Sequence, residues 1–486
     1  MSRTPVIKHQ VRGFVLTWSM LTFIIAGLTF FGIYLTYTPT SASESALENV
    51  AFPTATDPAA AAPATDVPAP TSTTPPQPTD APEPTAAPAV ESAQSTPVVI
   101  AQAQAASPEP LPTLTPTISP IDVDDFELGI QVQVPPSNDQ DEMRGWMSDV
   151  HQKLHMDWIK VQIGWEFTEP SPGEYDFRFL RTALRATDDT GTRVLLSVVD
   201  APDWAREPGV DLTRKGPPAD YQTYVNFVTE LVTRFGDRFH AIEVWNEQNL
   251  DREWTSVRGL RAEDYVEMLR QTYQAIKQIK PDMIVVSGAL STTGGCTNAQ
   301  GEVCAIDDFA YFDAMIQAGM LNYADCIGAH HNGYNLNPLE RWDSVTDDPS
   351  ATFRGPFDNP HHSWSFRSTL EYYATRVQAA GGTQKLCITE FGWASGEDLE
   401  GVPAGWDYAV DNTLQEQRDW TLQALDLMVE MGTVRIAILW NLNYGPQAGW
   451  APDNDNVPYS IIGPNFVHRP VFDALGEWSR EYKGIQ

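Results

Sequence analysis

Residues 239–249 read FHAIEVWNEQN, an apolar run that ends in the group WNE at residues 245–247. Residues 385–393 read KLCITEFGW and place Glu390 directly after a second apolar run. Short apolar runs of this kind are typical of strands buried in a parallel sheet. Polar side chains at the ends of such strands indicate a site at the C-terminal edge of that sheet.

The same pattern extends over residues 122–486, where short apolar runs alternate with amphipathic segments. This alternation predicts βα units and a parallel sheet. Strand candidates begin at residues 126, 158, 193, 239, 283, 325, 385 and 434. Helices are expected between them, among others at residues 220–235, 262–279, 365–377 and 414–432, with a last helix at residues 471–482. Eight such alternations fit a (β/α)8 TIM barrel of the α/β class.

A doubly wound sheet has a similar local pattern, so the position of the polar side chains decides between the two folds. The apolar runs end in Asp200, Asn246 with Glu247, His330, Glu390, and Trp440 with Asn441. Active sites of barrels are assembled from the C-terminal ends of many strands. The barrel is therefore the predicted fold.

Glu247 and Glu390 are a candidate pair of catalytic carboxylates. Retaining glycoside hydrolysis uses two carboxyl groups about 5–5.5 Å apart, one to protonate the leaving group and one to attack the anomeric carbon. Both glutamates follow apolar strands beside tryptophan or glycine, whereas most acidic residues lie on solvated surfaces. This chemistry requires no cofactor.

The motifs WNE at residues 245–247 and TEFGW at residues 389–393 resemble the paired signature of glycoside hydrolase clan A, nearest to families 5 and 39. The resemblance covers roughly residues 126–480. It implies a retaining glycosidase in which Glu247 is the acid/base and Glu390 the nucleophile. On this assignment we expect Glu390 to be ionised and the pKa of Glu247 to be raised by a more apolar setting.

The resemblance also implies substrate-binding residues. Asn246 would bind the sugar 2-hydroxyl, and Trp440 in ILWNLNY would stack against an apolar sugar face. His330 in GAHHNGYN would lie beside the nucleophile, with a core histidine as the alternative. Trp204 in DAPDWA either lines a subsite or packs in the core.

Two positions depart from the pattern of the clan. Many members have an arginine near the nucleophile on the second strand, where this chain has Lys160, which lacks the bidentate fork of arginine. The tyrosine that follows the sixth-strand histidine corresponds here either to Asn332 or to Tyr334, and we favour Tyr334.

Residues 337–366 are expected to form a long loop, rich in aromatic and polar side chains, that walls one side of a substrate cleft. Its candidate contacts are His361, His362 and Trp364. Asp453 and Asp455 either lie at the rim of the cleft or fix turns.

The chain carries 64 acidic and 31 basic residues, a formal net charge of -33. This balance disfavours nucleic acid, whose phosphates need clustered Lys and Arg. The four cysteines lack the paired spacing of a zinc site, so no metal is expected. Cys296 and Cys304 are a plausible disulfide pair in an oxidising compartment, whereas Cys326 and Cys387 lie in apolar runs and are expected to be buried free thiols.

The N-terminal region is predicted to anchor the domain in the membrane. Residues 13–37 carry no charge and, at about 25 residues, are long enough to span a bilayer. Basic residues precede them and none follows until Arg144, which places residues 1–12 in the cytoplasm and the rest outside. A cleavable signal peptide is the alternative, because Ser-Ala-Ser at residues 41–43 suits processing. Residues 38–121, dominated by Pro, Thr, Ser and Ala, are predicted to be a disordered linker.

Together these features predict a single-pass membrane protein whose extracytoplasmic domain, residues 122–486, is a retaining hydrolase of β-linked oligo- or polysaccharides. Two alternatives stay open. One is a membrane-anchored carbohydrate-binding or sensing protein without activity. The other is a transglycosylase, which uses the same residues and transfers the glycosyl group to a sugar instead of water.

Overall fold

The computed structural model describes residues 126–485. The N-terminal segment 1–12, the anchor 13–37 and the linker 38–121 that the sequence predicts all lie outside these residues. Within residues 126–485 no helix has both the length and the apolar character that a membrane span needs.

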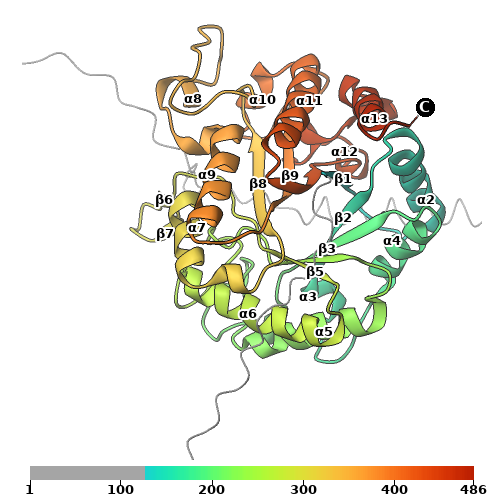
Figure 1. Cartoon of the computed structure of the whole chain (residues 1–486), viewed down its shortest axis with the longest axis vertical. Helices are drawn as coiled ribbons and strands as arrows, with labels where there is room; N and C mark the ends of the chain where they lie inside the picture. Colours follow the sequence, from blue (N-terminus) through green and yellow to red (C-terminus); the bar gives the residue numbers. More distant parts are fainter. Residues whose placement is uncertain (1–125, 486) are drawn as a thin grey trace, which may run out of the picture. The chain divides into compact units, whose positions relative to one another are not determined.

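Eight parallel strands form a closed barrel (Figure 1). The strands are β1 (Glu127–Gln131), β2 (Trp158–Gly164), β3 (Arg193–Val199), β4 (Ala241–Val244), β5 (Ile284–Ser287), β8 (Ile327–Gly333), β9 (Leu386–Trp393) and β10 (Val434–Leu439). They are hydrogen-bonded in the order β5-β4-β3-β2-β1-β10-β9-β8. A parallel bridge between Val286 of β5 and Cys326, just before β8, closes the ring. The predicted TIM barrel is therefore confirmed.

Helices lie around the outside of this sheet (Figure 1). The longer ones are α2 (Gln140–Ser148), α4 (Arg178–Asp188), α5 (Tyr221–Phe235), α6 (Ala262–Ile279), α7 (Asp308–Gln317), α9 (Phe366–Ala379), α11 (Leu414–Met431) and α13 (Pro470–Tyr482). Shorter elements are α3 (Trp165–Thr168), β6 (Cys296–Thr297), β7 (Val303–Ala305), α8 (Gly355–Asp358), η4 (His362–Trp364), α10 (Tyr408–Asp411), α12 (Tyr444–Gln447), β11 (Ile462–Gly463) and β12 (Val467–His468).

Local sequence explains where the helices begin and end. α11 starts with a capping box, in which the side chain of Thr413 accepts a hydrogen bond from the Glu416 N–H and the side chain of Glu416 accepts one from the Thr413 N–H. The same helix ends at Gly432, whose φ of 63° is a left-handed conformation that glycine adopts without steric cost.

The interior of the barrel changes from apolar to charged along its axis. Because side chains alternate between the two faces of a strand, Trp158 and Lys160 of β2 share one face, as do Ala241 and Glu243 of β4. Trp158 and Ala241 belong to a buried apolar cluster. Lys160 and Glu243 each lie one inward position nearer the C-terminal ends and have 0% exposure. The charged group therefore lies directly below the polar strand ends.

Two disulfide bonds are present, Cys296–Cys304 and Cys326–Cys387. The first closes the β6–β7 hairpin, as the spacing of these cysteines suggested. The prediction of free thiols at Cys326 and Cys387 was wrong. These cysteines are 61 residues apart in sequence, but β8 and β9 are neighbours in the barrel, and both side chains belong to the same buried apolar cluster.

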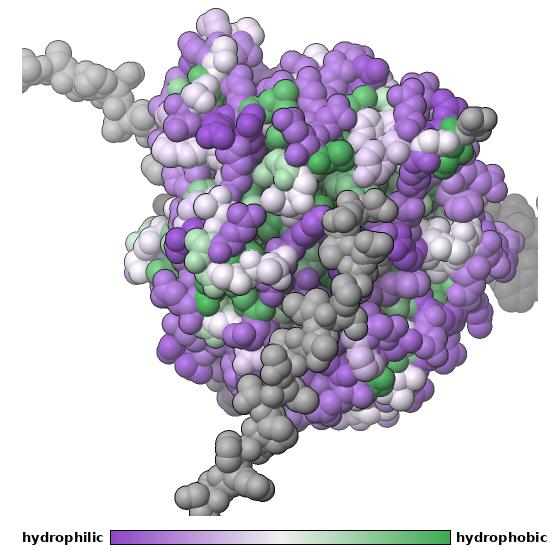
Figure 2. Space-filling model, viewed as in Figure 1, coloured by the Kyte–Doolittle hydropathy of each residue, from purple (hydrophilic) through white to green (hydrophobic). Residues whose placement is uncertain are grey.

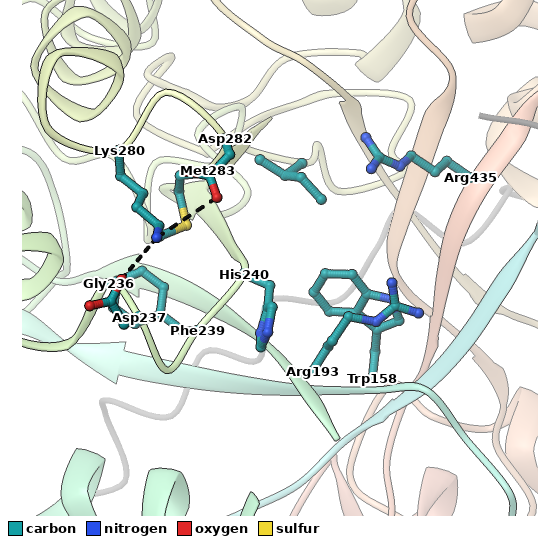
Figure 3. Close-up of a pocket in the computed structure, with 11 residues that line it drawn as sticks. Trp158, Arg193, Gly236, Asp237, Phe239, His240, Lys280, Asp282, Met283 and Arg435 are labelled. Carbon is teal, nitrogen blue, oxygen red and sulfur yellow. Dashed lines mark hydrogen bonds and ion pairs between the residues drawn. The ribbon is translucent and has the colours of Figure 1, made fainter. Parts of the chain in front are cut away.

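A pocket of about 370 Å³ lies at the N-terminal ends of the strands (Figure 3). Its lining includes Trp158 and Arg193, the first residues of β2 and β3, together with His240, which directly precedes β4. This pocket is therefore at the opposite end of the barrel from the polar strand ends. The face of the molecule seen in Figure 2 is covered largely by hydrophilic residues.

Candidate active site

Glu390 is held inside the barrel by Lys160. The Lys160 Nζ lies 3.0 Å from Glu390 Oε1 and 3.1 Å from Glu243 Oε2. Glu243 Oε1 accepts a further hydrogen bond of 2.6 Å from the hydroxyl of Thr389, the residue before Glu390. A single buried ammonium group thus joins a carboxylate on β4 to a carboxylate on β9.

His330 of β8 lies between the carboxylates of Glu247 and Glu390. Its Nδ1 is 3.3 Å from Glu247 Oε1 and 3.7 Å from Glu390 Oε2. Because both distances share one atom, these two carboxylate oxygens are at most about 7 Å apart, a limit that includes the spacing of about 5–5.5 Å used in retaining glycosidases. The two candidate glutamates, which are distant in sequence, therefore meet at one site.

The carboxylates of this site raise the pKa of its two basic side chains, Lys160 and His330. Burial alone would lower the pKa of Lys160, but the charges of Glu243 and Glu390 outweigh it and raise the pKa. Burial would likewise lower the pKa of His330, yet the charge of Glu390 and the hydrogen bond to Glu247 raise it. Both cations are thereby favoured in an interior that also holds three carboxyl groups.

The expected raised pKa of Glu247 was wrong. Burial raises the pKa of this carboxyl group, but the hydrogen bond and charge of His330, together with the charge of Arg252, outweigh burial and lower it. Arg252 approaches from the solvent side, with its Nη2 3.5 Å from Glu247 Oε2. The sequence argument considered the apolar flanks of Glu247 and missed the basic side chains that fold against it.

The backbone is strained where β4 ends. Trp245 and Glu247 have φ values of 75° and 47°, in the left-handed region that residues other than glycine rarely adopt. The N–H of Glu247 donates to the carbonyl of Ala289 across the barrel rim, and its carbonyl accepts from the N–H of Leu250, both at 2.9 Å. Such conformations cost about 1–3 kcal/mol each and cluster at functional sites.

Two amide side chains flank the carboxylates. The Oδ1 of Asn246 is buried and has no hydrogen-bond partner among residues 126–485. An unsatisfied buried acceptor of this kind needs an explanation, and a hydroxyl of a bound sugar would satisfy it. Asn332 donates through Nδ2 to Glu390 Oε2 at 3.4 Å. The structure thus places Asn332, and not the favoured Tyr334, against Glu390.

Aromatic rings line the site on one side. Tyr334 makes edge contacts with Trp364 and Tyr408, with ring centroids 4.6 and 5.1 Å apart. Trp440 follows β10 and lies 5.0 Å from the ring of Tyr444, and the Trp440–Asn441 peptide is cis. Rings in such positions present flat apolar surfaces against which a sugar can stack.

Trp204 lies further out, after β3, and is 36% exposed. Its Nε1 donates to the carbonyl of Glu169 at 3.0 Å, and its ring packs edge-on against Trp165. Asp453 and Asp455 are exposed. Burial, with a smaller effect from the charge of Asp455, raises the pKa of Tyr459. Within residues 126–485 none of these three side chains has a hydrogen bond or ion pair with Glu247 or Glu390.

Comparisons with known proteins bear on the fold. No family model matches this chain, and no curated protein matches its sequence. A solved family 39 glycoside hydrolase from the gut symbiont Bacteroides cellulosilyticus WH2 is 17% identical, with a TM-score of 0.52 over 74% of this chain and 64% of that chain. This chain shares the barrel fold of a family 39 glycoside hydrolase. That family is one of the two to which the motifs WNE and TEFGW pointed.

Two further solved structures are similar. An exo-beta-1,4-mannosidase from Opitutaceae bacterium strain TAV5 is 16% identical, with a TM-score of 0.47 over 74% of this chain and 59% of that chain. A monomeric beta-xylosidase from Caulobacter crescentus CB15 is 15% identical, with a TM-score of 0.48 over 72% of this chain and 67% of that chain. The chain spans less than two thirds of the length of the family 39 hydrolase and of the mannosidase.

Sequence reasoning missed three charged residues at the site, namely Glu243, Arg252 and Glu253. Glu243 could have been found, because a charged residue within the buried strand AIEV is unusual unless it has a partner. Burial and the charge of Glu247 raise the pKa of Glu253 to about 7. Arg252 and Glu253 gave no signal, because they lie in a loop whose path the sequence does not fix.

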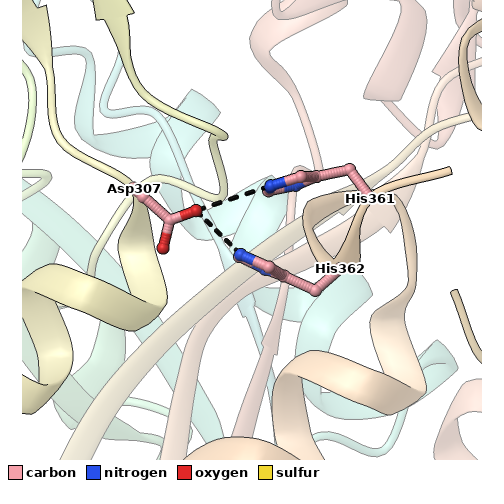
Figure 4. Close-up of side chains that lie close together, drawn as sticks. All are labelled: Asp307, His361 and His362. Carbon is pink, nitrogen blue, oxygen red and sulfur yellow. Dashed lines mark hydrogen bonds and ion pairs between the residues drawn. The ribbon is translucent and has the colours of Figure 1, made fainter. Parts of the chain in front are cut away.

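The loop that carries His361 and His362 brings both side chains together with Asp307 (Figure 4). These three residues are the group within residues 126–485 whose donor atoms are close enough to hold a metal ion. Trp364 of the same loop packs against Tyr334. The two histidines are thus joined to the wall of the site through Trp364.

Proposed function

We propose that this chain is a retaining glycoside hydrolase that cleaves β-linked oligo- or polysaccharides by double displacement. The observation that carries the proposal is the convergence of Glu247 and Glu390 on His330, with distances of 3.3 and 3.7 Å to the same nitrogen. The fold shared with a family 39 hydrolase supports it, as does the position of both glutamates at C-terminal strand ends.

In the first step Glu390 attacks the anomeric carbon, forming a carboxylate–sugar ester bond while the glycosidic C–O bond breaks. Lys160 contacts Oε1 of Glu390, so we assign the attack to Oε2, which lies 3.4 Å from Asn332 Nδ2 and 3.7 Å from His330 Nδ1. The leaving oxygen receives its proton from Glu247. Glu247 Oε1 lies 3.3 Å from His330 Nδ1. Burial lowers the pKa of His330, but the charge of Glu390 and the hydrogen bond to Glu247 raise it, so Glu247 and His330 titrate as a pair.

In the second step Glu247 takes a proton from water, whose oxygen attacks the same carbon and displaces Glu390. The charge of Glu390 disappears in the ester and returns on hydrolysis. Lys160 and His330 therefore lose a negative neighbour in the intermediate and regain it in the product, which favours breakdown of the ester. Asn246, with its unsatisfied Oδ1, is the proposed partner of the sugar 2-hydroxyl.

The test is covalent trapping. The full chain is incubated with a panel of activated 2-deoxy-2-fluoro β-glycosides and analysed by mass spectrometry, with Glu390→Gln and the exposed Glu400→Gln as matched variants. We expect one added glycosyl group on Glu390 in the wild type and in Glu400→Gln, and none in Glu390→Gln. A label on another residue would overturn the assignment of the nucleophile.

The alternatives give different results. A binding or sensing protein would show no label and no turnover, and its affinity for sugar would be unchanged in Glu390→Gln. A transglycosylase would be labelled in the same way, but it would release the sugar faster when a glycoside acceptor is added than in water alone.

We also propose that the domain is extracytoplasmic and held at the cell membrane by residues 13–37, with residues 38–121 as a spacer. The two disulfide bonds support this placement, because disulfides persist mainly in oxidising compartments. Protease treatment of intact cells tests it. Release of the soluble domain into the medium is the expected result, whereas protection of the domain would contradict the proposal.

A further inference from the structure

We propose that Asp307, His361 and His362 form a binding site for a divalent transition metal ion, with Zn²⁺ as the preferred occupant. Asp307 Oδ2 lies 2.8 Å from Nε2 of His362 and 3.5 Å from Nε2 of His361. Both imidazole rings therefore present the same nitrogen to one carboxylate oxygen, as Figure 4 shows. All three donor atoms lie within 4.8 Å of one another.

These separations suit a tetrahedral ion. Zinc bonds to nitrogen and oxygen are about 2.0–2.1 Å long, so two ligands of a tetrahedral site lie about 3.3 Å apart. The observed values of 2.8 and 3.5 Å lie on either side of that separation. Two imidazoles and one carboxylate leave a fourth position for water or for a group of a bound ligand, which is the usual composition of an open zinc site.

The second nitrogen of each ring is turned away from Asp307. Nδ1 of His361 lies 2.9 Å from the Ser363 hydroxyl and accepts a 3.3 Å hydrogen bond from the N–H of Ser363. Nδ1 of His362 is buried, has no hydrogen-bond partner in residues 126–485, and lies 3.7 Å from Asp308 Oδ1. Each ring is thus oriented with Nε2 inward.

The carboxylate is fixed in the same way. Asp307 precedes α7 and caps it, because its Oδ1 accepts a 3.0 Å hydrogen bond from the N–H of Ala310. Its Oδ2 is thereby left for the histidines. The ring of His362 stacks on Phe309 with centroids 3.6 Å apart. These contacts hold the donors in place before any ion binds.

The two imidazole rings lie close together, with centroids 4.0 Å apart. A bound ion would join the start of α7 to the loop that carries Trp364, and so brace the aromatic wall around Tyr334.

The site was missed in the sequence because the absence of a metal was argued from cysteine spacing. Here the ligands are two adjacent histidines and an aspartate more than fifty residues earlier, a separation that matches no short metal motif. Binding of the ion does not depend on the proposed hydrolase activity, so each proposal can fail without the other.

Calorimetric titration of the full chain with Zn²⁺, after removal of metals by chelation, tests the site. We expect one zinc per chain, and at least a 100-fold loss of affinity, or about 2.7 kcal/mol, when one donor is removed. The donor variants are Asp307→Asn, in which asparagine still caps α7, and His361→Gln, whose side chain is 35% exposed in the wild type and is replaced without disturbing the core. His468→Gln is the matched control, since His468 lies in β12.

Bound Co²⁺ provides an independent readout, because a tetrahedral site with two histidines gives visible absorption bands that vanish with either variant. Circular dichroism of each variant confirms that it folds. Equal zinc affinity in the wild type and in both donor variants would overturn the proposal, and so would the absence of any wild-type zinc binding at micromolar concentration.

Discussion

Lys160 and Glu243 form an ion pair inside the barrel, with Nζ and Oε2 3.1 Å apart and both side chains fully buried. The pair is not isolated, because the same ammonium group contacts Glu390 Oε1 at 3.0 Å. One cation thus compensates two carboxylates in a region that excludes water. A single lysine is thus shared between two glutamates.

Glu243→Gln should reduce turnover although Glu243 does not face the cleft. The substitution removes one of the two anchors of Lys160, so Lys160 and Glu390 lose their fixed geometry. We expect turnover to fall by about 10²-fold and the free energy of unfolding to fall by about 3 kcal/mol. Steady-state kinetics and urea unfolding measure the two effects. Glu263→Gln on the surface of α6, 62% exposed, should leave both unchanged.

Lys160→Met should make stability fall as the pH rises. In the wild type the charge of Lys160 lowers the pKa of Glu243, so Glu243 contributes stability above its unfolded pKa of about 4.3 and loses it as the pH falls through the lower folded pKa. Without Lys160, burial dominates and raises that pKa, so the contribution changes sign.

Urea unfolding of wild type and Lys160→Met between pH 4 and pH 8 measures this reversal. The difference in free energy of unfolding should be about 3–5 kcal/mol at neutral pH, as expected when one partner of a buried pair is removed, and should shrink towards pH 4. A difference that is constant over this range would mean that the lost lysine acts only through packing.

His330→Asn should move the alkaline limb of the pH–rate profile to higher pH. His330 lowers the pKa of Glu247 by its hydrogen bond and its charge, against the effect of burial. When that cation is removed, burial raises the pKa of Glu247, and the acid form that protonates the leaving group persists to higher pH. The profile of kcat/KM measures the shift. His331→Asn is the matched control, since His331 has no hydrogen bond or ion pair with Glu247. An identical shift in His331→Asn would show that His330 does not control the pKa of Glu247.

Removing Cys326 and Cys387 by double substitution with alanine should destabilise the fold more than removing Cys296 and Cys304. The loops closed by the two bonds span 61 and 8 residues. Their chain-entropy contributions are about 4 and about 2.5 kcal/mol. Guanidinium unfolding of the two double variants compares them, and an equal loss in both would show that loop length does not control the effect.

The sequence was sufficient to predict the barrel because each barrel strand is a short apolar run. Glu247, Glu390 and His330 were found by the same reasoning, since each follows such a run directly. Glu243 escaped it because the argument considered only the strand ends. The pairing of Cys326 with Cys387 depends on the adjacency of β8 and β9, which no local pattern contains.

The pKa of Glu247 shows a different limit. Its apolar neighbours in sequence predicted the effect of burial correctly, since burial is the largest single influence on this pKa. The opposing charges come from His330 on another strand and from Arg252 in the loop after β4. Such electrostatic environments are created by tertiary structure. They can be predicted only once the order of the strands in the barrel is known.

At one point in the barrel, two neighbouring strands pair over only a short length. β2 pairs with β3 along its whole length. β5 meets only the start of β8, through the bridge between Val286 and Cys326 and backbone hydrogen bonds of Asp325 and Cys326 to β5. Glu247, which follows β4, and His330, within β8, lie on opposite sides of this junction. The 3.3 Å contact between His330 and Glu247, the proposed acid/base, therefore spans this junction, whereas the Lys160–Glu390 contact joins β2 to β9 on the other side of the ring.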